Sequence, residues 1–247
     1  MKRNRKRSLL IGLVVIVLIP LVFFSWFSLK VKSEGKTMNP NPTKVLVDSV
    51  YCIKDGISNI YLIKNGKKYI AFDAGQNLDV IESELKSLSV DPKDIETVFL
   101  THSDLDHIAM LKLLPHAKVY LSEQEYQMVT NKKTRLLIFS NKLPDREYTT
   151  LKDGEIINIG ENKVLGILVP GHTPGSMCFV FNDRDLFTGD AFGIRNGKVE
   201  AFNEFFTMNT EQSLESLKKI EGLRNVQYFF TGHHGFGEYF RYFKPGE

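Results

Sequence analysis

The stretch that decides the fold is TVFLTHSDLDH, residues 97–107, in which an apolar run leads directly into two histidines and two aspartates. The chain has only six histidines in 247 residues, so this concentration is unusual. A short apolar run of this kind is typical of a buried strand. Loops that leave a rigid scaffold are where proteins place binding and catalytic side chains. The stretch therefore predicts a functional site at the end of a strand.

Three further stretches repeat this arrangement of an apolar run followed by polar and glycine residues. They are PGHTPGS at 170–176, TGDAFG at 188–193 and TGHHG at 231–235. A single histidine is more often a surface or core residue, but five of the six lie at such strand ends, and only His116 stands apart. Glycine lets backbone and ligand approach closely. Together the stretches predict a metal site built from several strand ends.

The pattern of strands and helices predicts two mixed β-sheets with helices outside them, an α+β arrangement. Apolar or alternating runs bounded by turn residues predict strands, and apolar spacing of three and four predicts helices. Asn209 is the expected N-cap of one helix, with Gln212 completing a capping box. Residues 131–147 receive no assignment. The expected strands lie at 44–54, 58–66, 67–75, 95–100, 117–122, 155–160, 163–170, 177–182, 184–189 and 226–230, and the helices at 77–90, 106–114, from 123, and 209–223.

The order of these motifs, preceded by Asp73 in FDAG, resembles the metallo-β-lactamase superfamily over about residues 45–240. The resemblance implies an αββα sandwich with a dinuclear metal site along one edge. It implies that Asp73 supports the site without binding metal. The Gly-His order of the family places the last ligand at His233 rather than at His234. The ligands implied for the first metal are His102, Asp104 and His172, and those for the second are Asp106, His107 and His233, with Asp190 as the bridge.

Asp104 departs from the usual His-x-His-x-Asp-His pattern, which has histidine at this position. A carboxylate is a harder ligand than imidazole, so it shifts the preference of the first site from Zn²⁺ toward Mn²⁺ or iron. The added negative charge also makes the centre a weaker Lewis acid. The alternative is that Asp104 simply ligates zinc. Two divalent ions, zinc with manganese or iron as alternatives, are the expected cofactors.

The resemblance favours a hydrolase that uses a metal-bound hydroxide on an ester, lactone, phosphodiester or related bond of a small molecule. Asp106 is the candidate for orienting water or relaying a proton. Two other classes stay open: a di-iron oxidoreductase of the flavodiiron type, which has a carboxylate where Asp104 lies, and a non-catalytic metal-binding module. The resemblance also separates this chain from homoserine-lactone lactonases, which have tyrosine where Gly193 lies.

The N-terminus predicts a membrane anchor. Residues 1–7 carry five of the 32 Lys and Arg residues, and 8–29 contain no charge over 22 residues, long enough to span a bilayer. The uncharged core is longer than that of a cleaved signal peptide. Basic residues before the span place the N-terminus in the cytoplasm and the rest outside. We therefore expect a linker at 30–44 and a catalytic domain at 45–247.

Composition adds little beyond a single globular domain: 43% of residues are hydrophobic and 25% are charged. The net charge of +3 is partly terminal, so no nucleic-acid partner is expected. Cys52 and Cys178 lie in apolar runs and are expected to be buried free thiols, with a disulfide as the alternative. Aromatic residues late in the chain either line a pocket or pack in the core. Residues 134–143 are interpreted as a segment covering the site, with an exposed helix as the alternative.

Overall fold

The computed structural model describes residues 14–135 and 140–243. The chain divides between Met38 and Asn39 into two units, and the larger, Asn39–Glu247, contains both main sheets. In the described part of the smaller unit, a π-helical turn η1 (Val14–Leu18) continues into the helix α2 (Ile19–Gly35).

The first sheet has seven strands, and they follow one another in chain order. Its first half is antiparallel, as expected for hairpins joined by Asp-Gly and Asn-Gly turns, while the strands from β4 to β7 are parallel neighbours. Asp48, with a φ of 46°, turns the chain so that the run predicted at 44–54 forms two strands. The strands are β1 (Lys44–Val47), β2 (Val50–Asp55), β3 (Ser58–Asn65), β4 (Lys68–Phe72), β5 (Ile95–Phe99), β6 (Lys118–Ser122) and β7 (Thr149–Leu151).

The second sheet has six strands in the order β15-β14-β11-β10-β9-β8. All neighbours are antiparallel except β11 and β14, which run parallel. A separate hairpin, β12 (Phe192–Arg195) and β13 (Lys198–Ala201), was not predicted from the sequence. The sheet's strands are β8 (Ile156–Ile159), β9 (Asn162–Leu168), β10 (Met177–Phe181), β11 (Asp185–Gly189), β14 (Tyr228–Thr231) and β15 (Phe236–Glu238).

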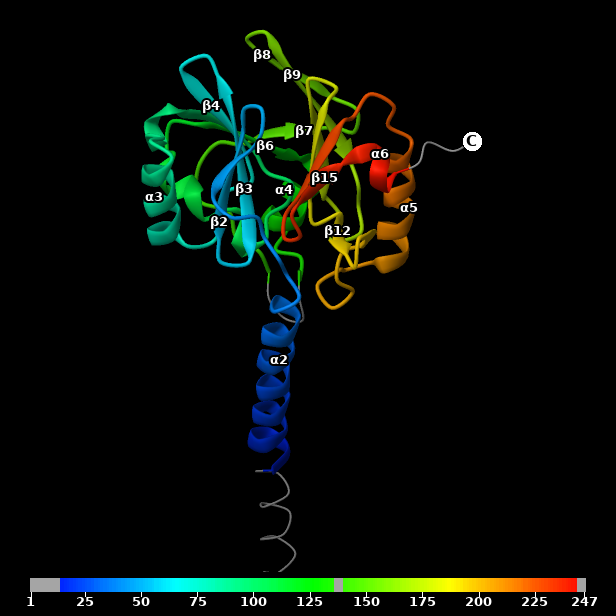
Figure 1. The fold of residues 1–247 in the computed structure, drawn as a ribbon. Coiled ribbons are helices and arrows are strands. Elements are labelled where there is room, and N and C mark those ends of the chain that lie inside the picture. Colours follow the sequence, from blue (N-terminus) through cyan, green and yellow to red (C-terminus); the bar gives the residue numbers. More distant parts are fainter. Residues whose placement is uncertain (1–13, 136–139, 244–247) are drawn as a thin grey trace, which may run out of the picture. The chain divides into compact units, whose positions relative to one another are not determined.

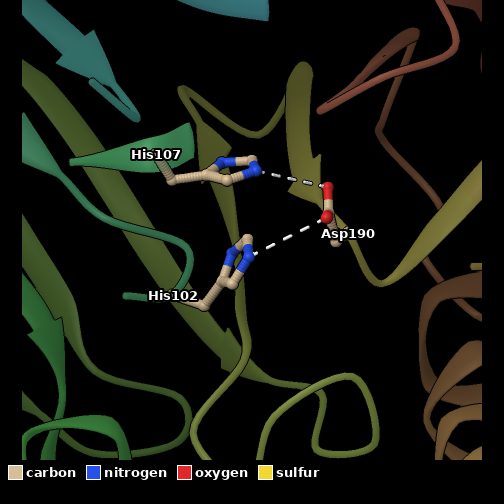
Figure 2. A group of neighbouring side chains, drawn as sticks. All are labelled: His102, His107 and Asp190. Carbon is tan, nitrogen blue, oxygen red and sulfur yellow. Dashed lines mark ion pairs between the residues drawn. The ribbon is translucent and has the colours of Figure 1, made fainter. Parts of the chain in front are cut away.

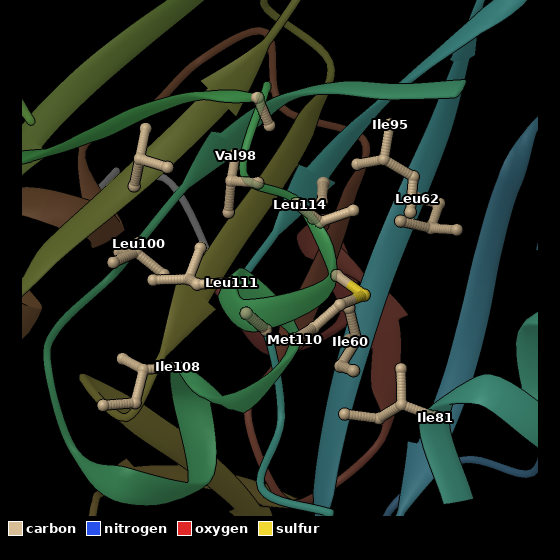
Figure 3. Packing of buried hydrophobic residues seen from close by; sticks show 14 of the residues in the cluster. Ile60, Leu62, Ile81, Ile95, Val98, Leu100, Ile108, Met110, Leu111 and Leu114 are labelled. Atoms are coloured by element: carbon tan, nitrogen blue, oxygen red, sulfur yellow. The ribbon is translucent and has the colours of Figure 1, made fainter. Parts of the chain in front are cut away.

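Three apolar clusters divide the larger unit into four layers. One cluster lies between the sheets, where Phe72 of the first sheet stacks on Phe187 of the second with ring centroids 3.8 Å apart. Side chains alternate along a strand, so Ala71 points the other way, into the cluster it shares with Ile81 of α3 (Figure 3). The third cluster joins the second sheet to Ile220 of α5.

This layering confirms the predicted αββα sandwich. Figure 1 shows α3 on one outer side and α5 on the other. Asn209 caps α5 as predicted, since its side chain accepts a hydrogen bond from the Gln212 amide. The α-helices of the larger unit are α3 (Leu78–Ser87), α4 (Glu123–Thr130), α5 (Thr210–Glu221) and α6 (Tyr239–Tyr242), and the 3₁₀ turns are η2 (Pro92–Asp94), η3 (Leu105–His107) and η4 (Ala109–Leu113).

The helix predicted at about 106–114 is two 3₁₀ turns rather than one α-helix. The reason lies in its backbone hydrogen bonds: the amides of Ala109 and Met110 donate to the carbonyls of Gly75 and Ala74. Those amides therefore donate to carbonyls in the loop after β4 instead of to the preceding helical turn. This bonding fixes the loop of His107 against the loop of Asp73.

The N-terminal helix has the length and composition of a membrane span over Val15–Gly35, with a mean hydropathy of 1.9. A signal sequence satisfies the same criteria. The helix continues through Gly35, so residues 30–35, which were expected in the linker, are helical. Residues 8–13 of the predicted anchor and the basic residues 1–7 lie outside the described residues.

Both cysteines are buried and free, as predicted. Burial raises the pKa of the Cys52 thiol to about 12, although Asn41 and Lys44 partly oppose it. Most of the late aromatic residues belong to the core: Phe229 and Phe230 of β14 and Tyr239 of α6 are buried in the apolar clusters.

Candidate metal centre

The carboxyl ends of parallel strand pairs bring the predicted ligands together. Asp73 follows β4, and the His102–His107 loop follows β5, its parallel neighbour. Asp190 follows β11, and His233 follows β14, again its parallel neighbour. Because parallel neighbours end at the same edge of a sheet, residues far apart in the sequence meet at that edge. His172 comes from the loop between β9 and β10.

The seven predicted ligands are all placed together. We call His102, Asp104 and His172 the first group, and Asp106, His107 and His233 the second group. Within each group, one ligand atom from every residue lies within 4.8 Å of the others. His102, His107 and Asp190 form a third such combination, which joins the two groups. Figure 2 shows these three side chains directed toward one another.

In the second group, the rings are oriented by contacts on their far sides: an ion pair for His107 and a hydrogen bond for His233. His107 Nδ1 lies 2.9 Å from Asp73 Oδ2, and His233 Nδ1 donates to the Ile57 carbonyl at 2.6 Å. Both rings therefore direct Nε2 inward, and the two Nε2 atoms lie 3.4 Å apart. Asp106 Oδ2 is 3.4 Å from His233 Nε2. This is how proteins commonly orient metal-binding histidines.

The carboxylates in and beside this group lie around the His107 ring. Burial alone would lower its pKa, but the carboxylates of Asp73, Asp190 and Asp106 outweigh burial and hold the pKa well above its usual value. Three negative groups around one buried ring favour a cation at this place, either a proton or a metal ion.

Asp190 lies between the two groups. Its Oδ2 is 3.1 Å from His233 Nε2 and 3.5 Å from His172 Nε2, and its Oδ1 is 3.6 Å from His107 Nε2. Gly232 makes this approach possible, because a Cβ at that position would collide with Asp190 Oδ1. The position fits the bridging role that the resemblance implied.

The side chains present fit a divalent metal ion. His102 Nε2 and Asp190 Oδ1 are buried and have no hydrogen-bond partner among the described residues. Such atoms carry an energetic cost unless something binds them. Neutral imidazole and carboxylate are the donor set of zinc, manganese and iron sites. The same atoms are the ones that face the other ligands of the centre.

The first group includes a cation that the sequence did not predict. Arg135 Nε donates to Asp104 Oδ1 at 2.7 Å, and its Nη2 donates to Asp104 Oδ2 at 2.6 Å. Asn141 Nδ2 donates to Asp104 Oδ1 at 2.6 Å. Both residues belong to the segment 134–143 that was interpreted as covering the site; residues 136–139 of it lie outside the described residues. No spacing or motif in the sequence connects position 135 to position 104.

The contact with Arg135 changes the pKa values of Asp104 and His172. Burial alone would raise the pKa of Asp104, but His102, His172 and Arg135 hold it well below its usual value. Burial and the nearby Arg135 lower the pKa of His172 to about 4. At neutral pH, His172 is therefore a neutral ring whose acceptor nitrogen is Nε2, 2.8 Å from Arg135 Nη2, and Asp104 is ionised.

Glu125 is a second residue that sequence reasoning missed. It is fully buried at the start of α4 and accepts hydrogen bonds from the Ser103 amide at 2.8 Å and from Thr173 Oγ1 at 2.6 Å. It therefore ties the loop of Asp104 to the loop of His172. The sequence offered an ordinary explanation for it, because Ser122 and Glu125 have the spacing of a helix capping box.

His234 lies beside the centre, and both of its ring nitrogens are buried without a hydrogen-bond partner among the described residues. Phe202 lies between the histidines, with its ring centroid 5.1 Å from that of His172 and 5.3 Å from that of His233. A side chain at Gly193 would collide with the His234 ring. The glycine found where lactonases have tyrosine thus has a steric reason.

Comparison with known proteins agrees with this geometry. The model of the metallo-β-lactamase superfamily matches residues 53–233. The chain belongs to the metallo-β-lactamase superfamily. This match covers every predicted ligand from His102 to His233, and it confirms the family that the motifs indicated.

Proteins named as hydrolases are among its relatives. The chain is 32% identical over 130 residues to a probable polyketide biosynthesis zinc-dependent hydrolase of Bacillus velezensis, covering 51% of each chain. It is 30% identical over 158 residues to a probable metallo-hydrolase of Methanocaldococcus jannaschii, covering 64% of this chain and 66% of the relative. It is 26% identical over 197 residues to an atrochrysone carboxyl ACP thioesterase of Aspergillus fumigatus, covering 77% and 55%. The matched stretches thus span between half and two thirds of these relatives.

Solved structures show the same fold at low identity. A β-lactamase from Chitinophaga pinensis superposes with a TM-score of 0.62 at 21% identity, covering 80% of each chain. A metallo-β-lactamase family protein from Thermus thermophilus gives a TM-score of 0.62 at 19% identity, covering 78% of this chain and 76% of that one. These similarities establish the αββα fold of superfamily members for this chain.

Proposed function

We propose that this protein is a membrane-anchored, metal-dependent hydrolase that cleaves an ester or thioester bond of a small molecule. The observation that carries the proposal is the convergence of the seven ligands, with His102 Nε2 and Asp190 Oδ1 buried and without a hydrogen-bond partner among the described residues. The proposed metal sites are the first and second groups, with Asp190 between them. The relative named as a thioesterase favours ester and thioester bonds over phosphodiesters.

Bound divalent ions supply Lewis acidity: they polarise the scissile carbonyl and acidify water. The chain's own residues supply position and proton transfer. Asp106 is the proposed proton carrier, because its side chain is 22% exposed to solvent. Asp190, which lies between the two groups, is only 4% exposed. A carboxylate at the solvent side can pass a proton from the attacking water to the departing group.

A groove of about 700 Å³ begins at Leu105, between Asp104 and Asp106, and supports a small-molecule substrate. Leu105 is 70% exposed at its edge. Among the described residues, none of the seven ligands lines this groove, and its wall includes Lys112, Lys142 and Asp79. The two lysines favour a substrate that carries negative charge in the part lying away from the metal groups. A tyrosine-assisted lactone mechanism is disfavoured, because His234 occupies the space beside Gly193.

The test is metal analysis of the purified full-length chain combined with a substrate panel of p-nitrophenyl esters, acyl thioesters, homoserine lactones, bis-p-nitrophenyl phosphate and a chromogenic β-lactam. We expect ester or thioester turnover that a chelator abolishes and Zn²⁺ or Mn²⁺ restores. Iron with oxygen consumption would instead identify an oxidoreductase. A chain that binds no metal would be a binding module.

The anchor has its own test. The charge pattern around the helix supports the proposal that the larger unit, Asn39–Glu247, lies outside the cytoplasm. Protease added to intact protoplasts is expected to digest the larger unit, with a cytoplasmic protein as the protected control. Full protection of the larger unit would refute this topology, and loss of the N-terminal helix from the mature protein would identify a cleaved signal sequence.

A further inference from the structure

The buried guanidinium of Arg135 uses the same atoms that the first group needs for a metal ion. Only 5% of the Arg135 side chain is exposed. Its Nη2 lies 2.6 Å from Asp104 Oδ2 and 2.8 Å from His172 Nε2. Arg135 Nε donates to the other oxygen of Asp104 at 2.7 Å, so the guanidinium binds both carboxylate oxygens through two hydrogen bonds. Two of the three ligands of the first group are thus already bound.

The contact with His172 decides whether this histidine can bind a metal ion, because it occupies the lone pair of Nε2. Arginine carries only hydrogen-bond donors and stays protonated in proteins, so in the 2.8 Å contact Nη2 donates and His172 Nε2 accepts. The 3.1 Å approach of the same nitrogen to Asp104 Oδ2 is then a contact without a hydrogen bond. A neutral imidazole has one acceptor nitrogen with a single lone pair. His172 Nε2 therefore cannot accept a hydrogen bond from Arg135 and coordinate a metal ion at the same time.

Charge acts in the same direction. Asp104 is the one carboxylate that belongs to the first group alone, and the guanidinium neutralises it at hydrogen-bond distance. A divalent ion entering beside Arg135 would face a fixed positive charge in a buried site, where such repulsion is strong. Among residues 14–135 and 140–243, no arginine or lysine is paired with the second group, whose near neighbours are Asp73 and Asp190.

We propose that Arg135 is the resident cation of the first group: it holds Asp104 and His172 in place of a metal ion, and this group binds metal only after the guanidinium has left. The proposal rests on the proposed function, since it assumes a metal in the second group. It also accounts for the aspartate at 104. A histidine there offers no carboxylate to the fork of an arginine, whereas aspartate matches it with two parallel hydrogen bonds.

The experiment compares metal binding by the full-length chain with that of Arg135→Met and Lys133→Met. Each apo protein is titrated with Zn²⁺ against a fluorescent chelator, and bound metal is counted by elemental analysis. Lys133 is exposed two residues before Arg135, so its variant removes an equal charge without touching Asp104. We expect the unaltered chain and Lys133→Met to bind one tight and one weak equivalent. In Arg135→Met the second equivalent is expected to tighten by about tenfold or more.

A third variant covers the case in which Arg135→Met does not fold, as judged by circular dichroism. Lysine carries the charge but cannot bind both Asp104 oxygens as a planar fork, so Arg135→Lys is expected to tighten the second equivalent to a smaller extent. Two equally tight equivalents in the unaltered chain, unchanged by either arginine variant, would overturn the role of Arg135 while leaving the hydrolase intact. Absence of metal from every protein would overturn both proposals.

Discussion

The two groups of the metal centre use similar side chains, yet they are supported in opposite ways. The rings of the second group are held from behind, by Asp73 and by the Ile57 carbonyl, so their inward nitrogens are free to face a metal ion. In the first group, Asp104 and His172 are bound from within by Arg135. We therefore propose that identical ligand types give unequal sites here, because the partner on the other side of each ligand decides what it can bind.

The largest expected effect separates the two groups directly. His107→Ala removes a ligand that three carboxylates surround, and it should abolish the tight metal equivalent and lower hydrolysis by about 100-fold or more. His172→Ala removes a ligand already occupied by Arg135, so the tight equivalent should stay. Metal content after dialysis checks both, and exposed His116→Ala serves as the control. Equal metal loss in His107→Ala and His172→Ala would contradict the proposed difference in metal binding between the two groups.

The sequence was sufficient to predict that the seven candidate ligands lie together, because they follow strand ends in a fixed order. His102 and His233 are 131 positions apart, yet each sits after an apolar run, and parallel strands end together. The layers were also predictable, since residues such as Ala71 and Phe72 alternate between two apolar environments. Arg135 was not predictable in this way: it lies in a stretch with no clear periodicity, and a lone arginine there is normally a surface residue.

The prediction of an α-helix at 106–114 was wrong for a different reason, since this stretch forms two 3₁₀ turns. Apolar spacing over 106–114 is compatible with an α-helix, and only the partners of the Ala109 and Met110 amides decide against it. Those partners, the carbonyls of Gly75 and Ala74, lie 34 and 36 positions earlier in the chain. Local pattern cannot report hydrogen bonds to a distant loop, so tertiary contact overrode the local preference here.

The second prediction tests the support of the second group. Asp73 has a φ of 61°, a conformation that asparagine also tolerates, so Asp73→Asn preserves the backbone while removing the charge behind His107. Loss of such a partner costs about 10- to 100-fold in metal affinity. We therefore expect the tight equivalent to weaken by that factor in chelator competition. The weak equivalent should keep its affinity; parallel weakening of both would show that Asp73 acts on the whole fold.

The third prediction concerns the cost of leaving Arg135 without its partner. Asp104→Asn removes the carboxylate, and breaking a fully buried ion pair in this way costs about 3–5 kcal/mol. Because Asp104 is 19% exposed, we expect a smaller loss of unfolding free energy for the apo protein, about 2 kcal/mol. Denaturant unfolding of Asp104→Asn, Arg135→Met and the double variant measures the coupling. Strictly additive losses would mean that the pair is not formed.

The smallest expected effect concerns Glu125, which connects the two loops of the first group. Glu125→Gln keeps the size and one acceptor oxygen, and the Thr173 hydroxyl can turn to accept from the new amide. The change therefore replaces charge-assisted hydrogen bonds with neutral ones, a loss of about 1 kcal/mol, or ~2–4 °C in Tm for a domain of this size. Zinc titration should show an altered weak equivalent only, since Ser103 and Thr173 flank Asp104 and His172 but no ligand of the second group. A weaker tight equivalent in Glu125→Gln would show that the two groups are mechanically coupled, and the contrast between them would then be one of degree.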